Sequence, residues 1–230
     1  MLQNKRISVL IPVFNEEKSI AQVIVELPQG LVDEIVVVDN GSTDATKEVA
    51  LRHGVRVVEE KYRGYGSACL KGLANIGNTD IVVVLDGDHS DYSEQINRLV
   101  EPIAAGEADF VIGSRVLGRR ESGALTPQQY WGNKLAVFMI HGLFGYKFTD
   151  MGPFRAIRFE NLKSFKMTDK DFGWNVEMQI KAIKNGLRIK EVPVDYRKRI
   201  GISKISGTVN GTIKAGIKII FTIFKYAVMN

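Results

Sequence analysis

The chain has 230 residues, enough for one large domain or two small ones, and its 45% hydrophobic and 25% charged residues are ordinary for a soluble globular protein. The single cysteine, Cys69, excludes an internal disulfide and a cysteine-rich metal site. No uncharged apolar stretch reaches the ~18 residues that a membrane-spanning helix needs, and the short N-terminal apolar run, broken by Pro12, predicts no secretory signal.

Positive charge collects at the C-terminal end of the chain. The net charge is +5, from 31 basic and 26 acidic residues. No acidic residue follows Asp195, whereas seven basic ones do: Arg197, Lys198, Arg199, Lys204, Lys214, Lys218 and Lys225. This distribution predicts an anionic partner, such as phosphate groups, a membrane surface or nucleic acid.

The first half of the chain alternates strand and helix patterns. In chain order we expect a strand over 7–11, a helix over 16–27, a strand over 34–38, a helix over 42–53, strands over 55–59 and 81–85 with a helix over 66–75 between them, and a strand over 110–113. Ser42 or Thr43 is the expected N-cap of the second helix. Repeated β-α-β units predict an α/β fold with a mostly parallel sheet covered by helices.

The second half is less regular. Helices are predicted over 128–144 and 174–185, a strand over 187–196, a basic loop over 198–207 and an amphipathic helix over 208–226. We therefore expect one compact domain, residues 1–206, with a helical appendage over 207–230. On that last helix Lys214, Lys218 and Lys225 lie within about 40° of one another, a pattern that suits either a membrane interface or a helix packed on the domain.

The motif Asp86-Gly87-Asp88 follows the apolar strand 81–85 directly. The carboxyl ends of parallel strands are where open α/β sheets bind ligands. Two close carboxylates repel one another unless a cation lies between them, and hard oxygen ligands suit Mg²⁺ or Mn²⁺ together with substrate phosphates. The motif therefore predicts a metal–diphosphate site at Asp86 and Asp88, although such pairs also occur in ordinary surface turns.

Further polar residues follow the other strands. Glu16 and Asp39 follow the first two, where a carboxylate can accept from a nucleobase or a ribose hydroxyl, although residues 39–43 also suit a plain turn. The turn with Gly64 and Gly66 resembles a phosphate-binding turn, but it lacks the third glycine of a dinucleotide site. In the basic loop, Arg199 can make a forked contact with a phosphate.

Six motifs occur in order: Pro12 with Asn15-Glu16, residues 39–44, Asp86-Gly87-Asp88, residues 113–115, residues 150–155, and Arg199 with Ser203-Lys204. Together they resemble the family-2 glycosyltransferases of GT-A fold, and most closely the polyprenyl- and dolichyl-phosphate sugar transferases. The resemblance extends to about Lys204.

The resemblance implies a role for each matching position. Donor-binding residues would be Pro12, Asn15, Glu16, Asp39, Gly64, Gly66, Asp86, Arg199, Ser203 and Lys204, with Asp86 and Asp88 as metal ligands. Arg115, Asp150 and Glu177 would be the catalytic residues on the acceptor side, with Glu177 or Asp150 as the base if the acceptor is a hydroxyl. The chain departs from the family pattern at Asn40, at Ser90, and in 123–131, which lacks an arginine for the lipid phosphate. Arg119 or Arg120 could replace that arginine.

The function implied is a metal-dependent, inverting transfer of a hexose from a UDP- or GDP-linked sugar to a polyprenyl phosphate or another lipid-linked acceptor. The cofactor would be Mg²⁺ or Mn²⁺, and the enzyme would work in the cytoplasm, at the inner face of the cell membrane. A hydroxyl acceptor in envelope glycan or glycolipid synthesis and a non-catalytic, membrane-bound nucleotide-sugar binder stay open. A sugar nucleotidyltransferase would need a glycine- and lysine-rich loop near the N-terminus, and nucleic-acid binding would need an aromatic-rich basic face; neither pattern is present.

Overall fold

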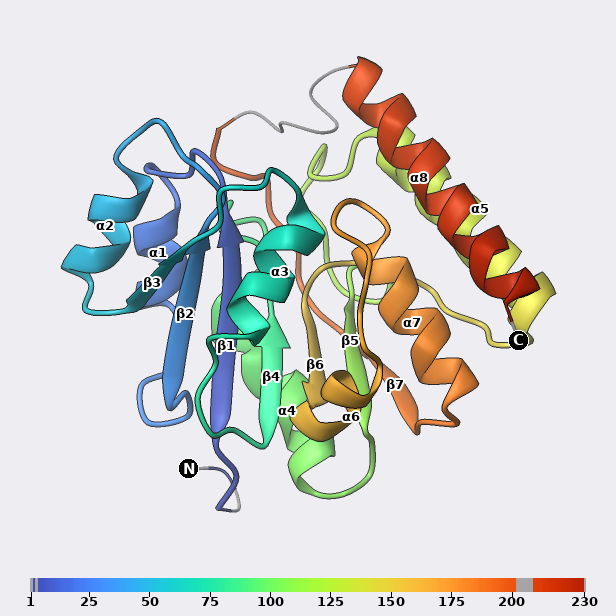
Figure 1. Cartoon of the computed structure of the whole chain (residues 1–230), viewed down its shortest axis with the longest axis horizontal. Coiled ribbons are helices and arrows are strands. Elements are labelled where there is room, and N and C mark those ends of the chain that lie inside the picture. The colour runs from blue at the N-terminus through green and yellow to red at the C-terminus, as the bar shows by residue number, and fades with distance from the viewer. Residues whose placement is uncertain (1, 3, 202–208, 230) are drawn as a thin grey trace.

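A computed structural model describes residues 2, 4–201 and 209–229. Its centre is a seven-stranded sheet with the order β3-β2-β1-β4-β6-β5-β7 (Figure 1). The strands are β1 (Ile7–Val13), β2 (Glu34–Asp39), β3 (Arg56–Glu59), β4 (Ile81–Val84), β5 (Phe110–Ser114), β6 (Arg155–Arg158) and β7 (Ile189–Pro193). Only β6 runs antiparallel to its neighbours in this sheet, so the predicted mostly parallel α/β architecture is confirmed.

Helices cover both faces of the sheet, because the strands alternate their buried side chains. In β1, Ile7, Val9 and Ile11 face the core shared with α1 (Ile20–Val25), α2 (Thr46–Arg52) and α4 (Ile96–Ala104), which follows the 3₁₀ turn η1 (Ser93–Gln95). Leu10 faces the opposite core, which contains residues of α3 (Tyr65–Leu73), α6 (Phe159–Ser164) and α7 (Trp174–Lys184). This alternation is the period-two pattern of a strand buried on both sides.

Two long helices extend the second of these layers. α5 (Pro127–Phe144) and α8 (Val209–Val228) lie side by side at one end of the sheet, next to α7 (Figure 1). The start of α5 agrees with the prediction and carries a capping box, in which Thr126 and Gln129 satisfy each other's backbone N–H groups. The predicted C-terminal helix is confirmed as α8. Within the described residues, no helix has the length and apolar character needed to cross a membrane.

Two predicted helix starts are wrong for the same physical reason. The residues before α1 and α2 do not form a first helical turn, because they hydrogen-bond to one another across the ends of β1 and β2. Asn15 has a left-handed φ of 54°, its N–H donates to Ser42 Oγ at 2.9 Å, and its Oδ1 accepts from Thr43 N at 2.8 Å. Ser42 and Thr43 are therefore not N-caps, and α2 begins only at Thr46.

Other boundaries also differ. β7 ends at Pro193 rather than at 196, because Tyr196 leaves the ladder to form isolated bridges with Asp91 and Arg120. The sequence analysis assigned no element to α4 or β6. Pro102 lies inside α4, and β6 has an arginine at each end, one of them the fully buried Arg155. α4 nevertheless carries Ile96, Leu99, Val100 and Ile103 at helical spacing, a signal that the sequence analysis did not use, whereas the four residues of β6 are too few to show a strand pattern. Residues 202–207 of the predicted basic loop lie outside the described part of the chain.

Candidate functional site

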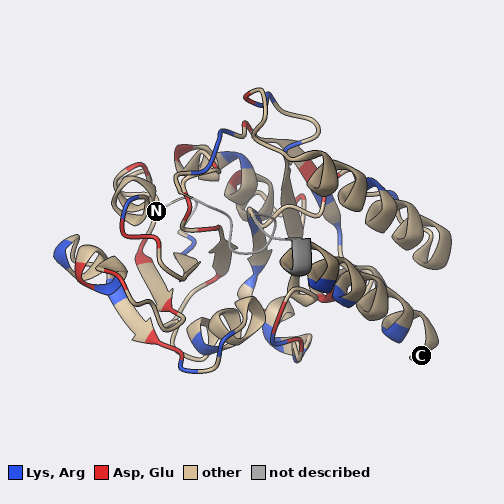
Figure 2. Cartoon of the chain, turned by 90° about the horizontal axis from the view of Figure 1, so that it is seen from above, with Lys and Arg blue, Asp and Glu red and all other residues tan. Residues whose placement is uncertain are grey.

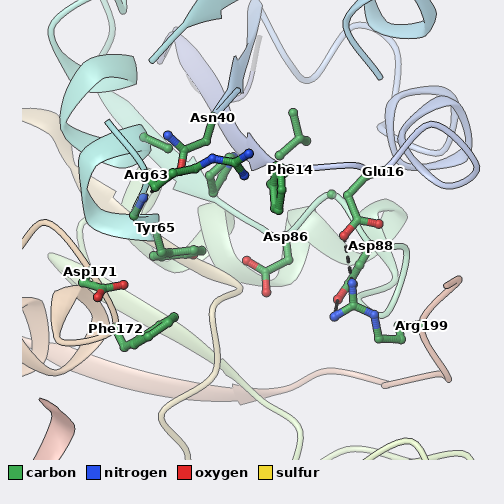
Figure 3. Close-up of a pocket in the computed structure, with 15 residues that line it drawn as sticks. Phe14, Glu16, Asn40, Arg63, Tyr65, Asp86, Asp88, Asp171, Phe172 and Arg199 are labelled. Carbon is green, nitrogen blue, oxygen red and sulfur yellow. Dashed lines mark hydrogen bonds and ion pairs between the residues drawn. The ribbon is translucent and has the colours of Figure 1, made fainter. Parts of the chain in front are cut away.

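The carboxyl ends of β1, β2 and β4 meet at one edge of the sheet and form a pocket of about 410 Å³. It is lined by Pro12, Val13, Phe14, Glu16, Asn40, Arg63, Gly64, Tyr65, Ala68, Asp86, Gly87, Asp88, Asp171, Phe172 and Arg199 (Figure 3). Six predicted donor or metal residues are therefore brought together: Pro12, Glu16, Gly64, Asp86, Asp88 and Arg199. Asn15 and Asp39 lie behind the lining, where Asp39 accepts from Ser42 N at 3.1 Å.

The two aspartates of the Asp-Gly-Asp turn have different surroundings. One Asp86 oxygen is buried and has no hydrogen-bond partner among the described residues. Burial and the nearby charge of Asp88 raise the Asp86 pKa to about 7. Asp88 is held in place, because its Oδ1 accepts from Ser90 N at 2.9 Å and from Ser90 Oγ at 2.5 Å. Ser90, one of the departures from the family pattern, thus orients Asp88.

Arg199 lies against this acidic turn. Its Nη1 is 3.1 Å from Asp88 Oδ2, and its Nη2 donates to Glu16 Oε1 at 2.8 Å (Figure 3). The preceding segment is fixed by Arg197, whose Nε donates to His89 O at 2.7 Å and whose guanidinium pairs with Glu26. The single positive charge of Arg199 is therefore already shared between two of the pocket's carboxylates. Ser203 and Lys204, which the sequence analysis also predicts to bind the donor, lie outside the described residues.

The opposite wall of the pocket is built around Asn40. Its side-chain amide donates to Glu60 O at 3.1 Å and Tyr62 O at 2.7 Å, and it accepts from Gly64 N at 2.8 Å. These bonds fix the loop that presents Arg63, whose guanidinium carbon lies 3.6 Å from the centre of the Phe14 ring. The amide at position 40, unlike an acid, can donate to two carbonyls, which explains why the loop tolerates this departure from the family pattern.

The glycines at the start of α3 do not form an open phosphate-binding turn. A Cβ on Gly64 would lie 2.1 Å from Lys170 O, and one on Gly66 would lie 2.1 Å from Asp169 O. Ser67 N donates to Lys170 O at 2.9 Å. These glycines therefore admit the backbone of residues 169 and 170, and only Gly64 also lines the pocket.

The predicted acceptor-side residues lie outside the pocket lining. Arg115 Nε and Nη2 donate to the two oxygens of Asp150 at 2.8 and 2.7 Å, a forked and buried pair. Burial alone would raise the Asp150 pKa, but the Arg115 guanidinium outweighs it and the net pKa is lowered. Arg155, in the same motif, is fully buried and donates to Asn175 O at 3.0 Å, which makes it a structural residue.

Glu177 is not brought to the pocket either. It is fully buried, and both carboxylate oxygens accept hydrogen bonds from the protein. Burial raises the Glu177 pKa, but hydrogen bonds to the carboxylate, those from Lys181 and Tyr226 first, outweigh it. The net pKa of Glu177 is therefore lowered. The base role for Glu177 stays a prediction, and these contacts favour the different role argued below.

A family model described as glycosyl transferase family 2 matches residues 8–165 of the chain. The chain belongs to this family. The resemblance seen in its motifs is thereby confirmed, and the protein is a glycosyltransferase.

Several relatives of this glycosyltransferase extend over most of its length. An uncharacterized glycosyltransferase of Mycobacterium tuberculosis is 35% identical over 91% of this chain and 94% of its own. A dolichyl-phosphate hexose transferase of Haloferax volcanii is 30% identical over 89% of both chains. Among solved structures, glucosyl-3-phosphoglycerate synthase of M. tuberculosis, in complex with Mn²⁺, UDP and glucosyl-3-phosphoglycerate, matches 99% of this chain and 81% of its own, with a TM-score of 0.78 at 24% identity. This structural likeness confirms the GT-A fold.

The structure adds residues to the glycosyltransferase site that the sequence analysis missed. Asp171 and Phe172 line the pocket from a loop with no recognisable motif. Asp91, three positions after Asp88, does not line the pocket, but both of its carboxylate oxygens are buried without a hydrogen-bond partner in the described part of the chain. Burial is the main cause that raises the Asp91 pKa well above its usual value, and the negative charge of Asp86 is the second. The third acid in the Asp-Gly-Asp-His-Ser-Asp run was the available signal for it.

The acidic turn fits a hard divalent cation. The unpartnered, buried oxygen of Asp86 and the oriented carboxylate of Asp88 offer oxygen ligands. No group of three acidic, histidine or cysteine side chains suited to a metal occurs among the residues described. Two carboxylates are nevertheless what Mg²⁺ sites commonly use, since substrate phosphates and water complete the shell.

Proposed function

We propose that this glycosyltransferase moves a hexose, with inversion, from a UDP- or GDP-linked sugar to a polyprenyl phosphate or related lipid-linked acceptor at the cytoplasmic membrane face. The observation that carries the proposal is the buried, unpartnered oxygen of Asp86 beside Asp88 and Arg199, in a pocket at the carboxyl ends of the strands. Such a carboxylate is costly to bury unless a bound cation completes it.

The leaving nucleoside diphosphate sets the chemical demand. Asp86 and Asp88 would hold Mg²⁺ or Mn²⁺, which, when bound, offsets the negative charge that develops on the diphosphate. Arg199 would turn from Glu16 and Asp88 toward a diphosphate oxygen, and Ser203 and Lys204 are proposed to contact the same group. Pro12, Asn15, Asp39 and Gly64 are proposed to shape the nucleoside end of the pocket.

The acceptor assignment draws on the named relatives and on the chemistry of Arg115 and Asp150. A phosphate monoester is largely ionised at neutral pH, so it attacks with little help from a base. The Asp150 carboxylate, paired with Arg115, then serves to fix that guanidinium near the acceptor. The relative from Haloferax volcanii, named as acting on dolichyl phosphate, supports this acceptor class.

The faces of α5 and α8 support a membrane surface as partner. Neither helix contains an acidic residue, and both appear tan and blue only in Figure 2. Large apolar side chains are exposed on both: Trp131, Leu135, Phe138 and Leu143 on α5, and Ile213, Ile217, Phe221, Phe224 and Val228 on α8. We call this set the α5–α8 face. Apolar side chains bordered by lysines suit the interface of an anionic bilayer.

The test is a transfer assay with a panel of labelled UDP- and GDP-sugars and Mn²⁺. Polyprenyl phosphate, the matching polyprenol and no acceptor are the three arms, with Asp88→Asn as the inactive control. We expect labelled lipid from polyprenyl phosphate only. Product from polyprenol alone would establish the hydroxyl-acceptor alternative, and donor binding without transfer in any arm would favour a non-catalytic binder.

A further inference from the structure

The loop of residues 168–173 forms a wall of the pocket. Asp171 and Phe172 line the cavity on the side away from Arg199 (Figure 3). Its backbone lies against the start of α3, where Ser67 N donates to Lys170 O and Gly66 leaves no room for a side chain. The position of this loop therefore decides the shape of the pocket.

Glu177, which does not line the pocket, binds the backbone of this loop. Its Oε1 accepts from Thr168 N at 2.9 Å and its Oε2 accepts from Asp169 N at 2.7 Å. The side chain is fully buried, and Lys181 Nζ, one helical turn along α7, lies 2.7 Å from Oε1. A buried carboxylate that accepts two backbone N–H groups fixes both peptide units in orientation.

The helix α8 contacts the same loop and the same carboxylate. Tyr226 OH donates to Glu177 Oε1 at 2.7 Å, and Lys218 Nζ lies 2.9 Å from Asp169 Oδ2. A Cβ on Gly173 would lie 2.5 Å from Thr222 Oγ1, so the loop end packs closely on the helix. Three successive turns of α8 thus touch a loop that precedes it by about fifty positions.

We propose that Glu177 is a positioning residue through which α8 sets the 168–173 wall of the donor pocket. This rests on the proposed function in so far as the pocket binds a nucleotide sugar. A base must reach the acceptor, whereas Glu177 has its oxygens occupied by the loop, Lys181 and Tyr226 and does not line the pocket. Through the same contacts the C-terminal helix would act on the donor pocket without lining it.

The test uses Tyr226→Phe, which removes the hydroxyl without changing the ring, together with Lys218→Met and Glu177→Gln in the full chain. Tyr146→Phe is the matched control, because Tyr146 OH donates to Ile189 O away from the loop, and Lys71→Met replaces an exposed lysine of α3. The first measurement is hydrogen exchange over residues 166–173 without ligand. We expect about five-fold faster exchange in Tyr226→Phe and Lys218→Met, as for the loss of one hydrogen bond, and no change in the controls.

The second measurement is turnover and donor affinity with UDP- or GDP-sugar and Mn²⁺. A positioning role raises the donor KM roughly five-fold in Tyr226→Phe and leaves kcat near the wild-type value. Unchanged loop exchange in both α8 variants overturns the proposal. So does a kcat loss of ~10²-fold or more in Glu177→Gln with unchanged exchange and donor KM, which is the signature of a base. If loop exchange is faster in the variants but the protein binds no nucleotide, the positioning of the loop by α8 and Glu177 is supported. The proposal that the pocket binds a nucleotide sugar is then rejected.

Discussion

At the scale of single residues, the Arg199 guanidinium contacts Asp88 and Glu16, so we expect it to compete with a metal for the acidic turn. We expect Arg199→Met to bind Mn²⁺ about ten-fold more tightly without nucleotide, since a charge-assisted contact to Asp88 is removed, and to bind the nucleoside diphosphate more weakly. Mn²⁺ titration followed by electron paramagnetic resonance measures the first effect and calorimetry the second. Arg52→Met, at the exposed end of α2, is the control. Equal Mn²⁺ affinity in Arg199→Met and wild type would show that the arginine does not compete.

Asp109, which lies away from the pocket, forms ion pairs whose contribution to stability depends on pH. Its carboxylate pairs with Arg188 at 2.7 Å and Arg158 at 3.0 Å. The Arg188 hydrogen bonds, set against burial, lower the Asp109 pKa to well below its usual value. A lowered native pKa stabilises the fold above the unfolded pKa near 4, and that contribution is lost as the pH falls below it.

We therefore expect Asp109→Asn to lower Tm by about 5 °C at pH 7, for ~2 kcal/mol of lost charge-assisted bonds. The Tm difference from wild type should stay constant from pH 8 to pH 5 and shrink below about pH 4. Thermal melts across this range measure it. Glu107→Gln breaks the exposed pair with Lys190 and should change Tm little. A difference that grows on acidification would contradict the assignment.

At the scale of elements, Gly66 shows how the N-terminal turn of α3 is shaped by a distant loop. Alanine normally stabilises a helix interior by ~1 kcal/mol relative to glycine. At Gly66 the new Cβ would lie 2.1 Å from Asp169 O, so the sign reverses. We expect Gly66→Ala to lose roughly 1–3 kcal/mol in urea unfolding. Gly142→Ala in α5 is the matched control, because nothing lies within 4 Å of its Cβ and it should gain stability.

The elements also show where sequence reasoning succeeds. The strands β1, β2 and β4 are apolar runs followed by polar turns, so both the sheet and the place of Asp86 could be predicted. The wall around Phe172 could not, because it depends on the bonds of Thr168 and Asp169 with Glu177 and on the contact of Lys170 with the distant Ser67. The resemblance implies a catalytic role for Glu177, and the sequence at that position carries no sign of the burial of its side chain. A hydrogen bond between a side chain of a helix and the backbone of a loop leaves no periodicity in the sequence.

At the scale of the whole molecule, the acidic groups of the pocket are separated from the apolar surface of the two long helices. The carboxylates around the pocket lie at the sheet edge, whereas the α5–α8 face is apolar with lysines and free of acids (Figure 2). Removing all of α8 would not test this face cleanly, because Ile223 and Tyr226 on its inner side belong to the core. Substitutions on the outer side leave that packing intact.

We expect replacement of the exposed Ile217, Phe221 and Phe224 by Asn to lower binding to vesicles that contain anionic lipid at least ten-fold. The reason is that full burial of each such side chain contributes ~1.5–3 kcal/mol. Cosedimentation measures the binding, and wild-type binding should weaken with added salt because lysines contribute to it. The matched control replaces Val25 and Leu51, equally exposed on α1 and α2, by Asn. Equal loss in both proteins would mean that binding is not specific to the α5–α8 face, and unchanged binding in the first would show that this face is not the binding surface. A wild-type protein that does not cosediment with the vesicles would remove the membrane from the list of partners.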